Sequence, residues 1–233
     1  YSLELFHGPT LAFKDVGGRF MARLLGYFIK KEGQKDVNVL VATSGDTGSA
    51  VANGFLGVEG IHVYVLYPKG KVSEIQEKQL NEHLSLTSAN SINVARFLPQ
   101  AFYYFYAYAQ LKRAGKADNA VICVPSGNFG NITAGLFGKK MGLPVKRFIA
   151  ANNRNDIFYQ YLQTGKYNPR PSIATIANAM DVGDPSNFAR VLDLYGGSHA
   201  EISAEISGTT YTDEQIRETV KETWKEHHYL LDP

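Results

Sequence analysis

The chain has 233 residues, of which 44% are hydrophobic and 20% are charged, so it can bury a sizeable core in one large or two smaller domains. Its formal net charge is only +2 and no basic run stands out, which argues against nucleic acid or an anionic membrane surface as a partner. A single cysteine, Cys123, excludes an internal disulfide and a cysteine-based zinc site and favours a reducing compartment, the cytoplasm.

Strand-like and helix-like segments alternate along the chain. A helical pattern comes first, with apolar residues at three- and four-residue intervals between Val16 and Phe28. Runs rich in β-branched residues and bounded by turn formers predict four buried strands, at Val37–Ala42, Ile61–Tyr67, Ala120–Val124 and Val145–Ala150. Further helices are expected over residues 98–114 and Asn131–Met141. The alternation predicts an α/β fold of open twisted parallel sheets with flanking helices.

The helix expected over residues 98–114 carries the aromatic-rich stretch AFYYFYAYA. Such rings could stack on nucleic-acid bases, but the stretch lacks the basic residues that usually accompany a base-stacking surface. Core packing is therefore the favoured interpretation.

The loop ATSGDTGSA leaves the first strand and opens a helix. It places several backbone N–H groups and the hydroxyls of Thr43, Ser44 and Thr47 around one spot, which suits an anion such as a carboxylate. A plain glycine-rich turn with a capped helix explains the loop equally well when it is considered alone.

The loop VPSGNFGNITAGL repeats this construction after the third strand. Gly127 and Gly130 bracket Asn128 and Phe129, which forms a phosphate-sized cradle of N–H donors. Two such loops in one chain favour ligand binding over two structural turns.

The absence of several sequence motifs excludes other classes of ligand. The second loop is not Gly-x-Gly-x-x-Gly, and Asn152 and Asn153 stand where a dinucleotide site needs an acid, so a dinucleotide is disfavoured. No Gly-Lys-Ser/Thr follows either loop, and no His-Glu-x-x-His is present. His227 and His228 lie on a charged helical segment and are interpreted as solvated, so no metal is expected.

Lys14 directly follows the apolar run Leu-Ala-Phe, near a loop-to-helix junction. Pyridoxal 5'-phosphate (PLP) unites this lysine with the two loops, because its aldehyde forms a Schiff base with a lysine, its phosphate needs backbone donors, and its amino-acid substrates carry a carboxylate. A lysine beside Phe13 and partly removed from water is expected to favour its neutral, nucleophilic form.

Five motifs in order resemble the threonine synthase family, within the fold-type II PLP enzymes. They are HGPTLAFKD, ATSGDTG, SANSIN followed by Arg96, PSGNFGN and NAMDVGDPSNF. The resemblance implies a PLP-dependent lyase of threonine biosynthesis with Lys14 as the Schiff-base lysine. The cofactor phosphate is expected on the main chain of Ser126, Gly127, Asn128, Phe129, Gly130 and Asn131.

The resemblance also assigns the substrate site. Thr43, Ser44 and Thr47 would hold the α-carboxylate, and Asn90, Ser91 and Arg96 the phosphate of O-phospho-L-homoserine. Asp46 stands where relatives often carry Asn facing the 3′-oxygen of the cofactor ring, and it would either share a proton with that oxygen or point elsewhere. The implied reaction eliminates phosphate from Cγ and adds water at Cβ, with Lys14 moving protons between Cα and Cβ.

Departures from the family pattern affect the expected domains. Relatives carry another strand and helix where QEKQLNEHLS stands, which suggests a segment missing near residues 78–81, and DLYGGSHAEISAE raises the same question for residues 194–204. A small domain is expected over residues 37–97, within a large cofactor-binding domain formed by residues 1–36 and 98–233 that is incomplete at both ends. The partner of the pyridine nitrogen is expected outside this chain, and the oligomeric state is left open.

Two alternatives remain at this stage. A serine or threonine dehydratase-like PLP lyase would share Lys14 and the glycine loop but would not need Arg96. A phosphate-binding module without catalysis would leave Lys14 unmodified.

Overall fold

A computed structural model describes residues 1–33, 37–42, 46–66 and 93–232, and the side chain of Asp46 is outside this description. The chain forms two compact units, Tyr1–Ala107 and Tyr108–Pro233. This division falls at a different point from the expected domain limits, which stay a prediction.

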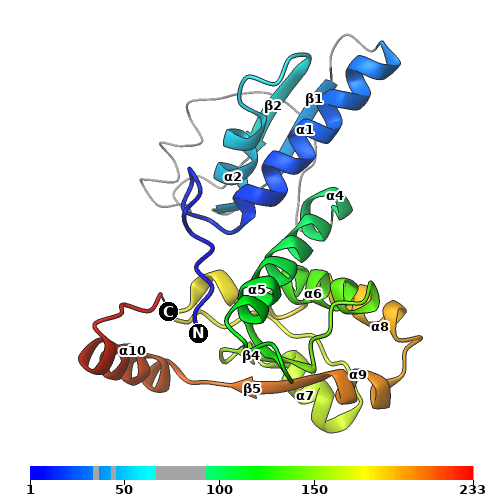
Figure 1. Cartoon of the computed structure of the whole chain (residues 1–233). Coiled ribbons are helices and arrows are strands. Elements are labelled where there is room, and N and C mark those ends of the chain that lie inside the picture. Colours follow the sequence, from blue (N-terminus) through cyan, green and yellow to red (C-terminus); the bar gives the residue numbers. More distant parts are fainter. Residues whose placement is uncertain (34–36, 43–45, 67–92, 233) are drawn as a thin grey trace. The chain divides into compact units, whose positions relative to one another are not determined.

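The first unit is built on a parallel strand pair. Strands β1 (Val37–Ala42) and β2 (Ile61–Leu66) run parallel in the register Val37 to Ile61 and Ala42 to Leu66. Helices α1 (Lys14–Glu32) and α2 (Asp46–Phe55) lie beside this pair (Figure 1). After the undescribed residues come α4 (Val94–Phe97), the short 3₁₀ helix η1 (Leu98–Gln100) and α5 (Ala101–Arg113), which continues across the division between the units.

Alternating burial explains the core of the first unit. Val39 and Val41 of β1 and Val63 and Val65 of β2 are buried, while their neighbours along each strand are less so. Side chains of α1 and α2 cover these valines, namely Met21, Ala22, Val51, Ala52 and Phe55. The period of two in the strands and of three to four in the helices therefore directs both patterns to one core.

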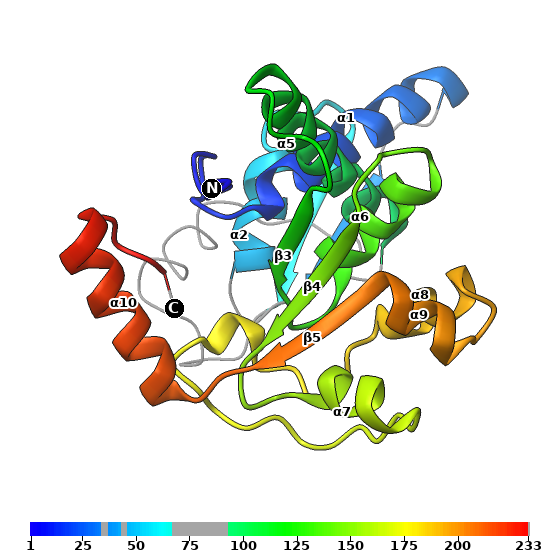
Figure 2. The same cartoon turned by 60° about the horizontal axis from the view of Figure 1, so that its bottom comes forward.

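The second unit contains a three-stranded parallel sheet. Its strands β3 (Val121–Pro125), β4 (Arg147–Asn152) and β5 (Ile206–Thr210) lie in the order β3-β4-β5 (Figure 2). The other elements of this unit are α6 (Gly130–Lys140), α7 (Ile157–Thr164), the 3₁₀ helix η2 (Asn178–Met180), α8 (Phe188–Leu194), α9 (His199–Glu205) and α10 (Asp213–His227).

Aromatic rings fill part of the second core. The ring centroid of Phe158 lies 4.6 Å from that of Phe129 and 5.6 Å from that of Phe188, and Tyr161 packs edge-on to Phe188 at 4.8 Å. Phe129, Phe158 and Phe188 are buried. Each ring adds area burial and a favourable edge or offset contact, so the cluster fixes the loop that carries Phe129.

The α/β class with parallel sheets and flanking helices is confirmed. The expected third and fourth strands lie one to two residues further along the chain than predicted, and Tyr67 falls outside the described residues. Sequence analysis missed β5 because its segment, ISGTT, lacks the apolar run that marked the others.

Two further expectations have mixed outcomes. In α5, Tyr103 and Tyr104 are buried whereas Phe102, Phe105 and Tyr106 are exposed, so core packing accounts for only part of the aromatic stretch. Residues 194–204 comprise the end of α8, a turn at Gly196 and Gly197 with positive φ, and α9. Residues 78–81 lie outside the described part of the chain.

Within the described residues, no helix is both long and apolar enough to cross a membrane. The same residues contain no group of three or more His, Cys, Asp or Glu side chains suited to a metal ion.

Candidate active site

Lys14 is the first residue of α1 and follows a tightly bonded turn. The buried carboxylate of Asp15 accepts from the Thr10 backbone N–H at 3.0 Å and from the Thr10 hydroxyl at 2.6 Å. Leu11, between them, adopts a left-handed φ of 56°, which a non-glycine residue takes only when its surroundings impose it. The turn thus has one strongly determined conformation, and this conformation sets where α1 and Lys14 begin.

A tyrosine from another helix also holds this turn. The Tyr103 hydroxyl on α5 donates to the carbonyl oxygen of Phe13, immediately before Lys14. Burial raises the pKa of Tyr103, and the nearby negative charge of Asp15 raises it further. Tyr103 therefore keeps the proton that it donates to Phe13.

Lys14 itself is half-buried, as expected for a lysine partly removed from water. Its Nζ lies 4.8 Å from the centroid of the Phe13 ring. An aromatic ring face attracts a cation, so this contact favours the ammonium form. Burial away from water, in contrast, favours the neutral amine that the sequence predicted, so the two effects oppose each other.

Several groups that could bind an anion lie near the start of α2. Arg96 is only 2% exposed, and its Nη2 donates to the hydroxyl of Thr47, near the N-terminus of α2, at 3.5 Å. Burial lowers the pKa of Arg96 to about 10, which leaves the guanidinium charged at neutral pH. The buried Ser49 hydroxyl, one turn into α2, has no hydrogen-bond partner in the described part of the chain. A buried cation, hydroxyls and a helix N-terminus together favour an anionic ligand.

Glycines bring the helices of Lys14, Thr47 and Arg96 into backbone contact. A Cβ on Gly17 of α1 would lie 2.2 Å from the carbonyl oxygen of Arg96 on α4, and one on Gly18 would lie 2.8 Å from that of Ala50 on α2. No side chain fits at these distances, so glycine is required. The packing thus places α1, which begins at Lys14, against both the helix of Thr47 and the helix of Arg96.

The remaining residues predicted for the substrate site are not described. Thr43, Ser44, Asn90 and Ser91 lie outside the described residues. Asp46 is the first residue of α2, but its side chain is not described. Their roles stay predictions.

The glycine loop connects β3 to α6 in the second unit. Ser126 is buried, its backbone N–H donates to the Ala151 carbonyl at 2.8 Å, and its hydroxyl donates to the Val124 carbonyl at 2.8 Å. Phe129 has a left-handed φ of 63°, and α6 begins at Gly130. The first N–H groups of a helix have no intrahelical acceptor, so this junction can present them to a phosphate.

The side chains of the loop are engaged within the protein. Asn128 Oδ1 accepts from the backbone N–H of Ser186 at 2.7 Å and from its hydroxyl at 2.8 Å. The Phe129 ring is buried against Phe158. The backbone, rather than these side chains, is therefore the part of the loop left to bind a phosphate, and the predicted phosphate contacts of residues 126–131 stay a prediction.

The structure gives a second reason for a glycine at position 127, besides the expected phosphate cradle. A Cβ at this position would lie 2.9 Å from the Cα of Met180 and 3.3 Å from its carbonyl atoms. The glycine therefore allows the segment around Met180 to approach the loop, in addition to any room it leaves for a ligand.

Two buried polar atoms beside the loop have no hydrogen-bond partner among the described residues. One is the hydroxyl of Thr133 in the first turn of α6, and the other is Oδ1 of Asn152, whose amide nitrogen donates to the Ser126 carbonyl at 2.9 Å. Such atoms mark places where a ligand or water completes the hydrogen bonding. Sequence reasoning missed both residues, and it also missed Ser49, because nothing local distinguishes them from capping or core residues.

Comparison with known proteins identifies the family of this chain. The profile of the family described as "Pyridoxal-phosphate dependent enzyme" matches residues 74–233. The chain belongs to this family of enzymes.

Within the family, threonine synthases are among the similar proteins. The chain is 43% identical over 265 residues to the threonine synthase of Haemophilus influenzae, a match that covers 100% of this chain and 61% of that protein. The crystal structure of Escherichia coli threonine synthase has a TM-score of 0.81 at 42% identity, covering 99% of this chain and 60% of that one. The PLP-bound threonine synthase of Brucella melitensis has a TM-score of 0.87 at 33% identity, covering 99% and 61%. The chain thus spans about three fifths of the length of these relatives.

Proposed function

We propose that this chain carries the cofactor and substrate residues of a threonine synthase, which converts O-phospho-L-homoserine and water to L-threonine and phosphate. The observation that carries the proposal is Arg96, a buried guanidinium beside Thr47 at the start of a helix, in a chain of a PLP-dependent family. A substrate with its own phosphate gives this buried cation a ligand of matching charge.

The described residues fit the cofactor. A backbone turn at the N-terminus of α6 suits its phosphate, and the partnerless atoms of Thr133 and Asn152 adjoin that turn. When bound, PLP would supply an electron sink that makes the substrate Cα–H acidic. Lys14, at the start of α1, would be the residue that joins its aldehyde.

The substrate contacts follow from the anion-binding arrangement. Thr47 and the start of α2 would receive the α-carboxylate, together with Thr43 and Ser44. Arg96 would grip the phosphate with Asn90 and Ser91, since a guanidinium can offer two parallel donors to a dianion. Asp46 stays a candidate for the group that faces the 3′-oxygen.

Lys14 would also be the proton carrier. Loss of phosphate from Cγ needs one proton removed from Cα and a second from Cβ. Water then adds its oxygen at Cβ and releases a third proton, and the three protons return to Cγ, to Cα and to the departing phosphate. The amine must alternate between neutral and charged forms for this purpose. The half-buried setting of Lys14 favours the neutral form, and its contact with the Phe13 ring favours the charged form.

The test separates threonine synthase from a dehydratase. In the intact protein, Arg96→Ala removes a charge-assisted contact worth about 1.5–3 kcal/mol, so kcat/KM for O-phospho-L-homoserine should fall by about tenfold to a hundredfold. Arg96→Lys should recover only part of the loss, because an ammonium keeps the charge without the fork. The matched control is Arg23→Ala, which removes an exposed arginine of α1.

The dissociation constant of PLP is measured in parallel. It should stay unchanged in the Arg96 variants, and borohydride reduction followed by mass spectrometry should find the pyridoxyl group on Lys14. Equal losses of substrate and cofactor binding would mean that Arg96 supports the fold. Turnover of threonine without turnover of phosphohomoserine would favour the dehydratase.

A further inference from the structure

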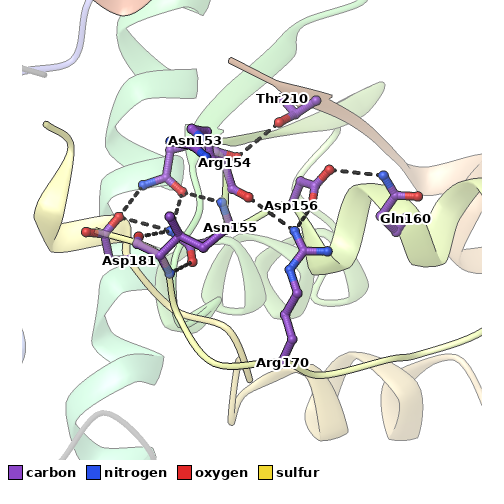
Figure 3. A network of polar contacts seen from close by, with 9 residues as sticks. Asn153, Arg154, Asn155, Asp156, Gln160, Arg170, Asp181 and Thr210 are labelled. Atoms are coloured by element: carbon purple, nitrogen blue, oxygen red, sulfur yellow. Dashed lines mark hydrogen bonds and ion pairs between the residues drawn. The ribbon is translucent and has the colours of Figure 1, made fainter. Parts of the chain in front are cut away.

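The segment from Ile173 to Asn187 contains all but the last residue of the motif NAMDVGDPSNF and has no role in the function proposed above. It contains little regular structure apart from η2, and yet it is tied to β4 by a dense polar network (Figure 3). Asp181 lies within this network, close to Asn153 and Asn155, which follow β4.

The Asp181 carboxylate accepts hydrogen bonds from both of the asparagines and from Thr175. Its Oδ1 accepts from Asn153 Nδ2 at 2.8 Å, from Asn155 Nδ2 at 3.0 Å and from the Thr175 hydroxyl at 2.7 Å. Its Oδ2 accepts from the Thr175 backbone N–H at 2.9 Å. Asn153 and Asn155 are 5% and 3% exposed, so these bonds lie largely away from water and are correspondingly costly to leave unmade.

The two asparagines bind the same segment at further points. Asn155 accepts from the backbone N–H of Ile173 at 2.7 Å and donates to its carbonyl at 2.8 Å. Asn153 donates to the Thr175 hydroxyl at 2.8 Å and to the Ala177 carbonyl at 3.3 Å. The two asparagines that follow β4 thus fix the path of the chain from Ile173 to Asp181.

The segment fixed in this way reaches the glycine loop at three points. The Cα of Met180 lies only 2.9 Å from the position that a Cβ on Gly127 would take. Ser186 donates twice to Asn128 Oδ1, and the fully buried Asn187 donates from Nδ2 to the Asn128 carbonyl at 2.9 Å. The conformation of the glycine loop is therefore set by residues some 50 to 60 positions further along the chain.

We propose that Asp181 is a positioning residue for the cofactor phosphate. Through Met180, Ser186 and Asn187 it would hold the backbone N–H groups of Gly127–Asn131 in the geometry that a phosphate needs, without touching the cofactor. The inference rests on the proposed function in one respect, that this loop is the phosphate cradle.

The decisive variant is Asp181→Asn. It keeps the size of the side chain but offers one acceptor atom where the carboxylate offered two, so at least one donor of Thr175, Asn153 or Asn155 is left facing another donor. Asp184→Asn is the matched control, because Asp184 is an exposed carboxylate of the same segment whose recorded bond, from the Tyr167 hydroxyl at 2.7 Å, lies outside the network.

The readout is the ratio of two dissociation constants measured on the intact protein, for PLP and for pyridoxal, which lacks the phosphate. In Asp181→Asn the affinity for PLP should fall by about tenfold or more while that for pyridoxal changes by no more than about twofold. The Asp184 control should leave both within about twofold. A parallel fall for both ligands, or no fall for either, would overturn the proposal.

Ser186→Ala keeps the inference testable if Asp181→Asn does not fold. It removes one of the two bonds to Asn128 Oδ1, leaves the network at Asp181 intact, and should lower the affinity for PLP by about threefold without affecting pyridoxal. An unchanged ratio in a folded Ser186→Ala protein would count against the proposal. Failure of the parent protein to bind PLP at all would instead refute the proposed function.

Discussion

The lysine turn of the first unit (residues 8–15) and the glycine loop of the second unit (residues 126–131) are held in different ways. In the lysine turn, the main hydrogen bonds join Thr10 to Asp15, five positions away. In the glycine loop they join Asn128 to Ser186 and Asn187, 58 and 59 positions away. The first conformation is therefore largely local, whereas the second depends on the completed fold.

The two regions also share a feature. Each leads into a helix through a non-glycine residue with positive φ, Leu11 in the lysine turn and Phe129 in the glycine loop. Each region is also held by a carboxylate that is not expected to touch a ligand. This carboxylate is Asp15 for the lysine turn and Asp181 for the glycine loop. This arrangement places reactive or binding groups without occupying the space that a ligand needs.

Substitution of Gly127 should have the largest effect, because it disrupts the long-range contact between the glycine loop and Met180. Its Cβ would collide with the Met180 backbone, which the Asp181 network prevents from moving away. We expect Gly127→Val to lose about 1–3 kcal/mol of unfolding free energy by overpacking, and to weaken PLP binding by about tenfold or more. Urea unfolding and cofactor titration measure the two effects.

Gly208→Ala in β5 is the control for that experiment. The nearest atom to its Cβ would be the flexible end of Leu162 at 3.0 Å, which can move at little cost. If Gly127→Val behaves like this control, the approach of Met180 does not constrain the glycine loop. Phe129→Leu should lower stability by loss of a buried ring, with a smaller effect on cofactor affinity.

Removal of the local hydrogen bonds between Thr10 and Asp15 should have an intermediate effect. Asp15→Ala leaves the Thr10 N–H and hydroxyl without their acceptor and should cost about 1–3 kcal/mol, whereas Thr10→Val should cost about 1 kcal/mol. The two losses should not add, because both substitutions remove the same contact. Urea unfolding of the single and double variants gives the coupling energy.

Glu32→Ala, at the exposed end of α1, is the control for the Asp15 variant. Slower borohydride trapping of PLP on Lys14 in Asp15→Ala would link the turn to the reactivity of the lysine. If the losses of unfolding free energy in Asp15→Ala and Thr10→Val were strictly additive, the contact between these two residues would not stabilise the lysine turn.

The smallest effect is expected from Tyr103→Phe, which removes the bond to the Phe13 carbonyl and should cost about 1 kcal/mol at neutral pH. Burial and the charge of Asp15 raise the pKa of Tyr103 in the folded chain, while the pKa of an unfolded tyrosine is about 10. Above that pH the unfolded chain binds fewer protons, so the stability contributed by Tyr103 is present below about pH 10 and is lost as the pH rises.

The role of the Tyr103 hydroxyl is tested by how steeply the free energy of unfolding falls as the pH rises above neutral. Tyr103→Phe should lose less stability than the parent between neutral pH and about pH 11. Tyr106→Phe, on the exposed part of the same helix, is the matched control. Identical slopes in both variants would show that the Tyr103 hydroxyl does not stay protonated against Phe13.

The sequence by itself was sufficient for the parts that depend on neighbouring residues. Residue periodicity gave the α/β alternation, and turn chemistry gave the helix that begins at Lys14 and the glycine-rich junction before α6. These features follow from local backbone preferences and side-chain spacing, which are fixed before the chain folds.

Only the tertiary structure decided which distant residues act together. It placed Arg96 beside Thr47, 49 positions away, and it showed Gly127 to be required by Met180 as well as by any ligand. It also supplied β5, which joins the sheet through its backbone although its sequence has little apolar character. Such contacts depend on which backbone segments meet in the folded chain. A local sequence pattern cannot predict them, because each segment could pair with many others until the core has formed.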